Sequence, residues 1–141
     1  MMKNPHAVLI LACTILLLSC NKQHDNDGIM CTTEYRMLTV SIKDPESKPV
    51  ILSNYFVKKT STGEIIDFAT EDHFIDSVNR VQGIYFLCTD GMMGMTAKNG
   101  TDFEFHGILD STEIVFQKYI IGNNRCHVEL LAGKTAIVVG K

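Results

Sequence analysis

The chain has 141 residues, a formal net charge of −3 and 45% hydrophobic residues, which is the composition of a folded protein rather than a disordered one. Its 13 basic residues are outnumbered by 16 acidic ones, and because nucleic-acid binding needs a basic surface, this balance excludes a nucleic-acid partner. The length allows one hydrophobic core without a metal or heavy cross-linking, so we expect one domain and no cofactor.

The first residues have the pattern of an export signal. A short polar stretch with Lys3 precedes an unbroken, largely apolar run at residues 7–18, which is typical of a secretory signal peptide. A helix that spans a membrane needs about 20 apolar residues, and this run is shorter. We therefore expect a leader that is removed rather than a permanent membrane span.

The end of this run, Leu17, Leu18, Ser19 and Cys20, resembles the lipobox of bacterial lipoproteins. The resemblance implies a signal peptide at residues 1–19 and acyl chains such as palmitate on Cys20, and several chains anchor a protein stably. It implies a lipid-anchored protein of the cell envelope, with the outer membrane favoured over the inner one and the exposed side left open. The alternative is an ordinary cleaved signal with an incidental thiol at Cys20.

The segment after Cys20 is polar. Residues 21–28 contain no apolar side chain and cannot bury enough surface to fold. We expect residues 20–30 to form the lipidated start and a flexible tether, and residues 31–141 to form the folded domain. Lys3 is the only charge in the leader, so the mature chain has a net charge of −4, which argues against electrostatic docking on anionic headgroups.

Three cysteines remain in the expected domain, namely Cys31, Cys88 and Cys126. An exported protein meets an oxidising compartment, and three thiols allow one bridge. Cys88 lies in an apolar strand pattern, where a free cysteine behaves as a small hydrophobe. Our hypothesis is therefore a Cys31–Cys126 disulfide that pins the start of the domain to its end, and a bridge that includes Cys88 is the alternative.

Period-two alternation of apolar residues predicts short strands over most of this domain. They span residues 34–43, 50–59, 64–69, 81–89, 102–109, 112–121, 125–131 and 135–139. Residues 44–49 form a proline-containing turn. Residues 70–80 suit a helix capped by Thr70, with Phe74 and Val78 on one side. Since no further helices alternate with the strands, we predict an all-β fold, a single antiparallel β-sandwich of seven or eight short strands.

Several turn residues resemble landmarks of one family, the carboxypeptidase regulatory-like domains. They are Asp44 through Pro49 and Val50, then Thr62, Gly63 and Glu64, then Gly83, Ile84 and Tyr85. Domains of this family are small transthyretin-like β-sandwiches. The resemblance covers residues 34–139 and implies a supporting or binding role, and it carries no catalytic residue to transfer.

A metal site is the first chemical possibility. Met92, Met93 and Met95 lie in a glycine-rich loop that runs from Gly91 to Thr101 and precedes His106. Thioether and imidazole groups are soft ligands that suit copper(I), so these four residues are candidate ligands. The competing interpretation is that the methionines fill gaps under the loop, as methionine often does.

Catalysis is not predicted. A nucleophile needs a base within reach and a third group to orient it, no motif of this kind is visible, and we expect His73, His106 and His127 on the solvated surface. Carbohydrate binding is not expected either, because the chain has no tryptophan and its tyrosines lie in predicted strands. We predict a non-catalytic accessory module that interacts with another envelope protein. The alternative is a small-ligand or copper-binding protein that uses the glycine-rich loop.

Overall fold

The computed structural model describes residues 28–68 and 73–140. The chain divides into two compact units, Met1–Cys31 and Thr32–Lys141, and the fold belongs to the second. The predictions for the signal peptide, for Cys20, for most of the tether and for the cap at Thr70 fall outside the described residues. Within the described residues no helix is long and apolar enough to cross a membrane.

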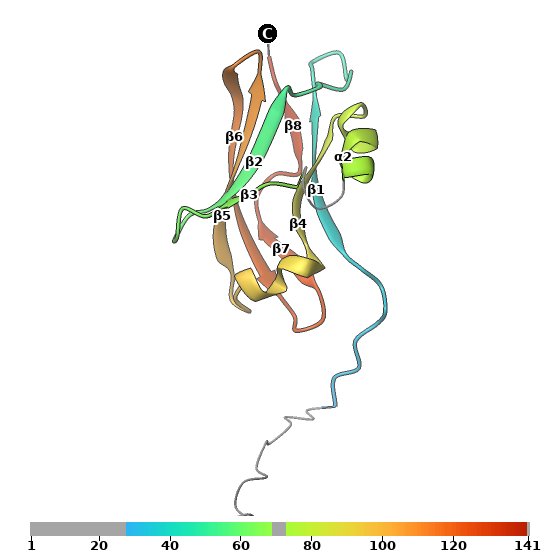
Figure 1. The fold of residues 1–141 in the computed structure, drawn as a ribbon, viewed down its shortest axis with the longest axis vertical. Coiled ribbons are helices and arrows are strands. Elements are labelled where there is room, and N and C mark those ends of the chain that lie inside the picture. The colour runs from blue at the N-terminus through green and yellow to red at the C-terminus, as the bar shows by residue number, and fades with distance from the viewer. Residues whose placement is uncertain (1–27, 69–72, 141) are drawn as a thin grey trace, which may run out of the picture. The chain divides into compact units, whose positions relative to one another are not determined.

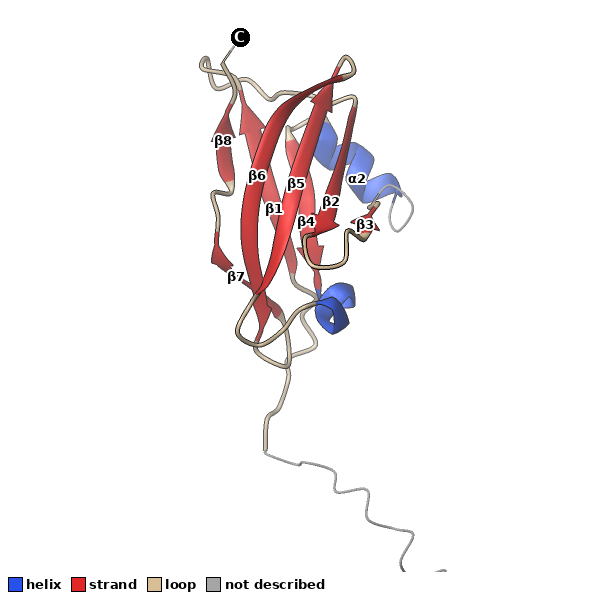
Figure 2. Ribbon diagram, turned by 90° about the vertical axis from the view of Figure 1, so that its left-hand side faces the viewer, coloured by secondary structure: helices blue, strands red, loops and turns tan. Residues whose placement is uncertain are grey.

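Within the described residues, eight strands form two facing sheets, which confirms the predicted all-β sandwich (Figure 1). One sheet has the order β4-β1-β8 and the other the order β3-β2-β5-β6-β7. Figure 2 shows the five-stranded sheet in front of the three-stranded one. The strands are β1 (Met37–Lys43), β2 (Asn54–Lys59), β3 (Ile65–Ile66), β4 (Ile84–Thr89), β5 (Thr101–Leu109), β6 (Thr112–Asn123), β7 (Val128–Ala132) and β8 (Ala136–Val138).

One strand pair departs from the predicted antiparallel arrangement. β1 and β8 run parallel, with Ser41 opposite Ala136 and Lys43 opposite Val138. A parallel pair requires a long crossover connection, and here the intervening chain builds the whole second sheet. The periodicity of a strand carries no information on the direction of its neighbour, so the sequence pattern could not reveal this pair.

The core lies between the sheets and follows the predicted alternation. On β5, Phe103 and Phe105 are fully buried, while Glu104 and His106 point outward. Removal of such side chains from water is the main force that holds the two sheets together. The fully buried large side chains are Tyr85, Tyr119, Phe103, Phe105, Ile42, Leu87, Ile121, Val40, Val57, Val128 and Cys88.

The predicted strand at residues 50–59 begins later than expected, because β2 starts only at Asn54. The buried hydroxyl of Tyr85 accepts a hydrogen bond from the Leu52 N–H at 2.8 Å and donates one to the Val50 carbonyl at 2.7 Å. A side chain thus satisfies backbone groups that a neighbouring strand would otherwise pair. As a result Leu52 and Tyr55 are both buried, although a continuous strand would place them on opposite faces.

The turn after β1 and the glycine before β4 belong to the same corner. The Asp44 carboxylate accepts hydrogen bonds from the N–H groups of Glu46 and Lys48, each at 2.9 Å. Gly83 has a φ of +67°, and a Cβ at this position would lie 2.5 Å from the carbonyl oxygen of Ile42 on β1. The corner therefore requires a residue without a side chain at position 83.

The predicted helix is confirmed as α2 (His73–Arg80), which contacts β4. Among residues 75–80, whose side chains are described, the buried residue is polar: Asp76 accepts a hydrogen bond from the Tyr55 hydroxyl at 2.5 Å and pairs with Arg80 at 2.6 Å. Val78, expected on the packed side, is exposed. The helix thus reaches β2 of the opposite sheet through the hydrogen bond between Tyr55 and Asp76.

Candidate functional site

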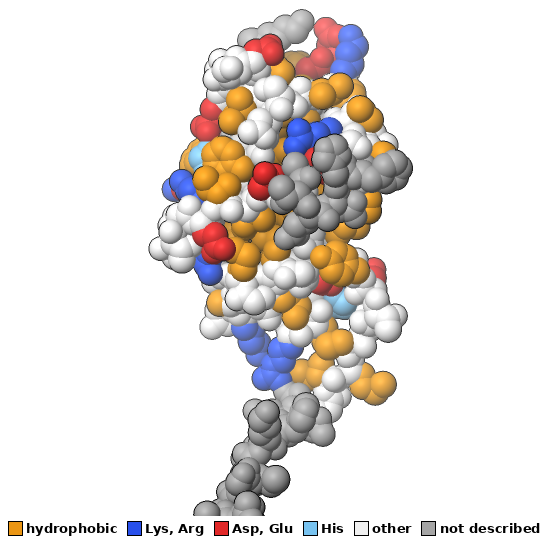
Figure 3. Space-filling model, viewed as in Figure 1, with side chains coloured by type: hydrophobic (Ala, Val, Ile, Leu, Met, Phe, Trp, Pro, Cys, Tyr) orange, Lys and Arg blue, Asp and Glu red, His pale blue; other side chains and the backbone are white. Residues whose placement is uncertain are grey.

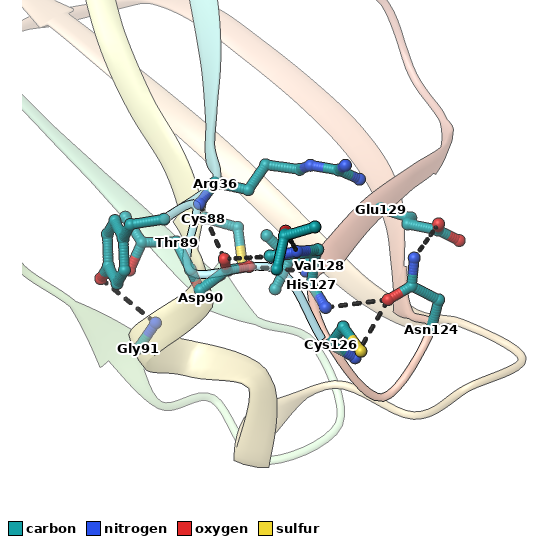
Figure 4. A network of polar contacts seen from close by, with 12 residues as sticks. Arg36, Cys88, Thr89, Asp90, Gly91, Asn124, Cys126, His127, Val128 and Glu129 are labelled. Carbon is teal, nitrogen blue, oxygen red and sulfur yellow. Dashed lines mark hydrogen bonds and ion pairs between the residues drawn. The ribbon is translucent and has the colours of Figure 1, made fainter. Parts of the chain in front are cut away.

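The Asp90 carboxylate collects three hydrogen bonds where β4 passes into the short 3-10 helix η1 (Asp90–Met95), as Figure 4 shows. Its Oδ2 accepts from the Arg36 N–H at 2.7 Å and lies 2.7 Å from Nδ1 of His127. Its Oδ1 accepts from the Val128 N–H at 2.8 Å. One side chain thereby joins the segment before β1, the start of η1 and the start of β7.

The imidazole of His127 extends this network to the beginning of the domain. Its Nε2 lies 2.9 Å from the hydroxyl oxygen of Thr32. The ionised Asp90 carboxylate can only accept a hydrogen bond, so Nδ1 of His127 carries a proton and donates a hydrogen bond to this carboxylate. In the neutral ring, Nε2 then has no proton and accepts a hydrogen bond from the Thr32 hydroxyl. We call the three residues Thr32, His127 and Asp90 the Asp90 brace.

The prediction that His127 lies on a solvated face is wrong, because this residue is only 7% exposed. It belongs to the turn before β7, where strand alternation does not apply. The Asn124 side chain shapes this turn, accepting from the N–H groups of Cys126 and His127 at 3.1 and 2.8 Å and donating to Glu129 at 2.6 Å. An asparagine that bonds to the backbone two residues on is the local signal that marks such a turn.

Two opposing effects act on the pKa of Asp90. Burial of the carboxyl raises it, but the hydrogen bonds from the Arg36 N–H, the His127 side chain and the Val128 N–H lower it further than burial raises it. The pKa of Asp90 therefore lies below its ordinary value. The carboxylate is ionised at neutral pH, as an acceptor of three donors must be.

The cysteines differ in state. Cys31 and Cys126 are both disulfide-bonded, whereas Cys88 is a free, buried thiol. Burial raises the pKa of Cys88 to about 12, so almost no reactive thiolate forms at neutral pH. Cys88 acts as a small core residue, as its apolar surroundings predict, and the pairing of Cys31 with Cys126 stays a prediction at this point.

The candidate copper ligands are not brought together. Met92 is buried in the core, and Met93 and Met95 are partly buried against it. His106 lies beside the fully buried Phe105 on β5, and since successive side chains of a strand point to opposite faces, its imidazole faces away from that core. No group of three or more His, Cys, Asp or Glu side chains within residues 28–68 and 73–140 could hold a metal ion.

The surroundings of His106 also differ from the predicted solvated surface. Its side chain is only 12% exposed, its Nδ1 lies 2.6 Å from a carboxylate oxygen of Glu113, and its ring stacks on Phe56 with a centroid distance of 4.5 Å. His106 is thus engaged on the outer face of the sheet, away from the methionines, so the interpretation that the methionines fill gaps under the loop is the better supported one.

Met92 and Met95 also line an open hollow of about 360 Å³ together with Gly91 and residues 64–67.

No family model matches the chain, and no curated protein or solved structure matches it significantly. The fold and the site define a class on their own terms. That class is a two-sheet β-sandwich whose first residues are joined to its β7 end by a partly buried carboxylate and a buried imidazole.

The Asp90 brace has the hydroxyl, imidazole and carboxylate order of serine hydrolases, yet we expect no nucleophilic reactivity at Thr32. Acyl transfer also needs hydrogen-bond donors aimed at the developing oxyanion, whereas the hydrogen bond between the Thr32 hydroxyl and His127, at 2.9 Å, joins two parts of the domain. Incubation with a fluorophosphonate followed by peptide mass spectrometry should leave Thr32 unmodified. Labelling of Thr32 that disappears in Thr32→Val would contradict a structural role for the brace.

Proposed function

We propose that this chain is an exported lipoprotein that holds a non-catalytic β-sandwich at the cell envelope through acylated Cys20 and acts there as an accessory or protein-interaction module. The observation that carries the proposal is the Asp90 brace, because it reinforces the point where a membrane tether would enter the domain. The leader pattern at residues 7–18 supports export, and the lipobox resemblance supports a lipid anchor at the cell envelope.

The brace suits a domain that is loaded at its N-terminal end. Thr32 bonds to His127, and the backbone of Arg36 bonds to Asp90, so the residues before β1 are held by η1 and the β7 turn. A tether that pulls on the chain before Thr32 would load these contacts before it loads the strands of the sandwich. Bonds to an ionised group are stronger than neutral ones, and this network therefore resists separation of the first residues from the sandwich.

We further propose that Cys31 and Cys126 pair with each other. Both are disulfide-bonded, and their chain neighbours Thr32 and His127 are in hydrogen-bond contact at 2.9 Å. Disulfides persist in oxidising compartments, so this pairing supports export. It would add a covalent link at the same place as the Asp90 brace.

Membership of the carboxypeptidase regulatory-like family is part of the same proposal. Its support is that landmarks from separate parts of the chain meet at one corner of the sandwich. Tyr85 bonds to Val50 directly after the proline turn, and Gly83 packs against Pro49 with a distance of 3.1 Å from the position of its absent Cβ to the Cβ of Pro49. Such domains are small supporting or binding modules, which agrees with the accessory role.

Cys20→Ala should abolish membrane association of the full chain expressed in a Gram-negative host. We expect the wild-type chain almost entirely in the membrane fraction, with a mature N-terminus at Cys20 whose peptide mass includes fatty acid, and a loss of at least tenfold from this fraction for the variant. Cys13→Ala is the matched control, because Cys13 lies within the expected leader and should not affect acylation. A wild-type chain that retains its leader and carries no fatty acid would refute the lipoprotein proposal.

The same purified protein tests the disulfide. Unreduced peptide mapping should recover one linked peptide pair that contains Cys31 and Cys126, with Cys88 as a free thiol. A bridge that includes Cys88 would overturn the pairing without affecting the lipid anchor.

A further inference from the structure

The outer face of the five-stranded sheet carries a row of three rings, which we call the aromatic strip: Phe56 on β2, His106 on β5 and Phe116 on β6. They are direct register neighbours. Phe56 stacks on His106 at 4.5 Å, and Phe116 packs against the same imidazole at 5.2 Å. Phe116 is 51% exposed, which leaves a large apolar side chain half in water in the middle of a sheet.

The orientation of the rings indicates what they can contact. Phe56 and His106 are nearly parallel, at 12°, with a centroid separation close to the spacing between neighbouring strands. Their ring faces are therefore directed along the sheet toward each other, and their edges point outward. Outward ring edges suit interdigitation with the side chains of another sheet.

Charges of opposite sign border the strip on its two sides. On one side the register places Lys58, Glu104 and Lys118 in a row. Lys58 pairs with Glu104 at 2.6 Å, and the two lysines with one glutamate leave this row with one excess positive charge. On the other side lies Glu113, 47% exposed and positioned by its bond to His106. Figure 3 shows hydrophobic side chains around a histidine on the side of the five-stranded sheet, with acidic side chains above them and basic ones below.

Along β6 the outward side chains thus run negative, aromatic, positive: Glu113, Phe116 and Lys118. At about 3.4 Å per residue, Lys118 lies roughly 7 Å from Phe116 and Glu113 at most about 10 Å from it. The two charges are therefore at comparable distances on opposite sides of the exposed ring. Such an arrangement is complementary to an inverted copy of itself.

We propose that two copies of the chain pair face to face through the aromatic strip, about a two-fold axis that runs along the strip and across the strands. Under this symmetry Phe116 meets its counterpart and Lys118 of each copy faces Glu113 of the other. An axis along the strands would instead set Lys58 against Lys118 and Glu104 against Glu104, which is repulsive. The charge pattern selects the first arrangement. This inference goes beyond the proposed function and does not depend on the lipid anchor.

Cysteine cross-linking of the full chain, purified in detergent, tests the geometry. Two differently tagged chains, one with Glu113→Cys and one with Lys118→Cys, should form an oxidised heterodimer with at least ten times the yield of two Glu113→Cys chains. Val138→Cys is the matched control, because Val138 is 67% exposed but lies on β8 of the other sheet, and it should not cross-link. Equal yields for all three combinations, or no mixed product, would overturn the proposal.

Charge reversal provides an independent test on the purified full chain in detergent, followed by analytical ultracentrifugation. Glu113→Lys or Lys118→Glu alone should weaken dimerisation at least tenfold, and the double variant should restore it, since each pair regains opposite charges. Phe116→Ser should also give monomers, while Val138→Ser should leave the dimer unchanged. A wild-type chain that is monomeric, or a double variant no better than the single ones, would rule out this interface. A chain that lacks fatty acid but dimerises as described would refute only the anchor.

Discussion

Asp90→Ala is expected to lower the free energy of unfolding by about 3–5 kcal/mol, since a hydrogen bond to a charged group contributes about 1.5–3 kcal/mol and the donors left behind are costly. The substitution leaves the N–H groups of Arg36 and Val128 and the imidazole of His127 without their acceptor. All three lie where the start of the domain meets η1 and β7. Denaturant unfolding of the purified protein measures the loss.

Asp90→Asn separates the effect of charge from that of size. Its amide keeps one acceptor oxygen but turns an NH₂ group toward a donor, so we expect a loss of stability nearly as large. Asp102→Asn is the control, because Asp102 is exposed on β5, and a surface substitution should change stability by no more than about 0.5 kcal/mol. A loss at Asp90 no greater than that at Asp102 would contradict the brace.

The contribution of Asp90 should also depend on pH. The pKa of Asp90 is lowered in the folded protein, so its stabilisation is fully present above the ordinary pKa of aspartate and is lost as the pH falls through the folded value. The stability difference between the wild type and Asp90→Asn should therefore be present at neutral pH and shrink below about pH 4. A difference that stays undiminished far below this pH would contradict this sign.

Gly83→Ala is expected to lower the free energy of unfolding by about 3–5 kcal/mol, as much as Asp90→Ala. A left-handed backbone costs a residue with a side chain about 1–2 kcal/mol, and Gly83 has a φ of +67°. Its new Cβ would in addition lie 2.5 Å from the Ile42 carbonyl and 3.1 Å from the Cβ of Pro49. Ile42 is a fully buried residue of the central strand β1, so relief of this overlap has to displace part of the core.

Gly63→Ala is the matched control for this prediction. Gly63 has a φ of +71°, almost the same as Gly83, but a Cβ there would meet nothing within 4 Å. Gly63→Ala should therefore lower the free energy of unfolding only by the roughly 1–2 kcal/mol that a left-handed backbone costs a residue with a side chain. Denaturant unfolding of both variants isolates the close approach at position 83, and equal losses would show that the corner is looser than the structure has it.

Features that depend on neighbouring residues could be predicted from the sequence. The alternation of Phe103 and Phe105 with Glu104 and His106 places two side chains in the core and two outside, because the period of a strand is a local property. The turn residues after β1, the helix that ends at Arg80 and the sandwich itself follow in the same way. The lipobox resemblance at Cys20 also depends on a few consecutive residues, so the expectation of export could be drawn from the sequence.

The candidate sites depended on contacts between distant residues. Asp90 and His127 lie 37 positions apart, and Thr32 and His127 lie 95 apart. No spacing rule connects such residues, since their contact depends on how the two sheets face each other. The aromatic strip needs the register of three strands, because a shift by one residue would turn His106 into the core. The chain sequence thus determined the strands, their inward faces and the expected address, whereas only the tertiary structure decided which polar groups share a carboxylate and which charges flank Phe116.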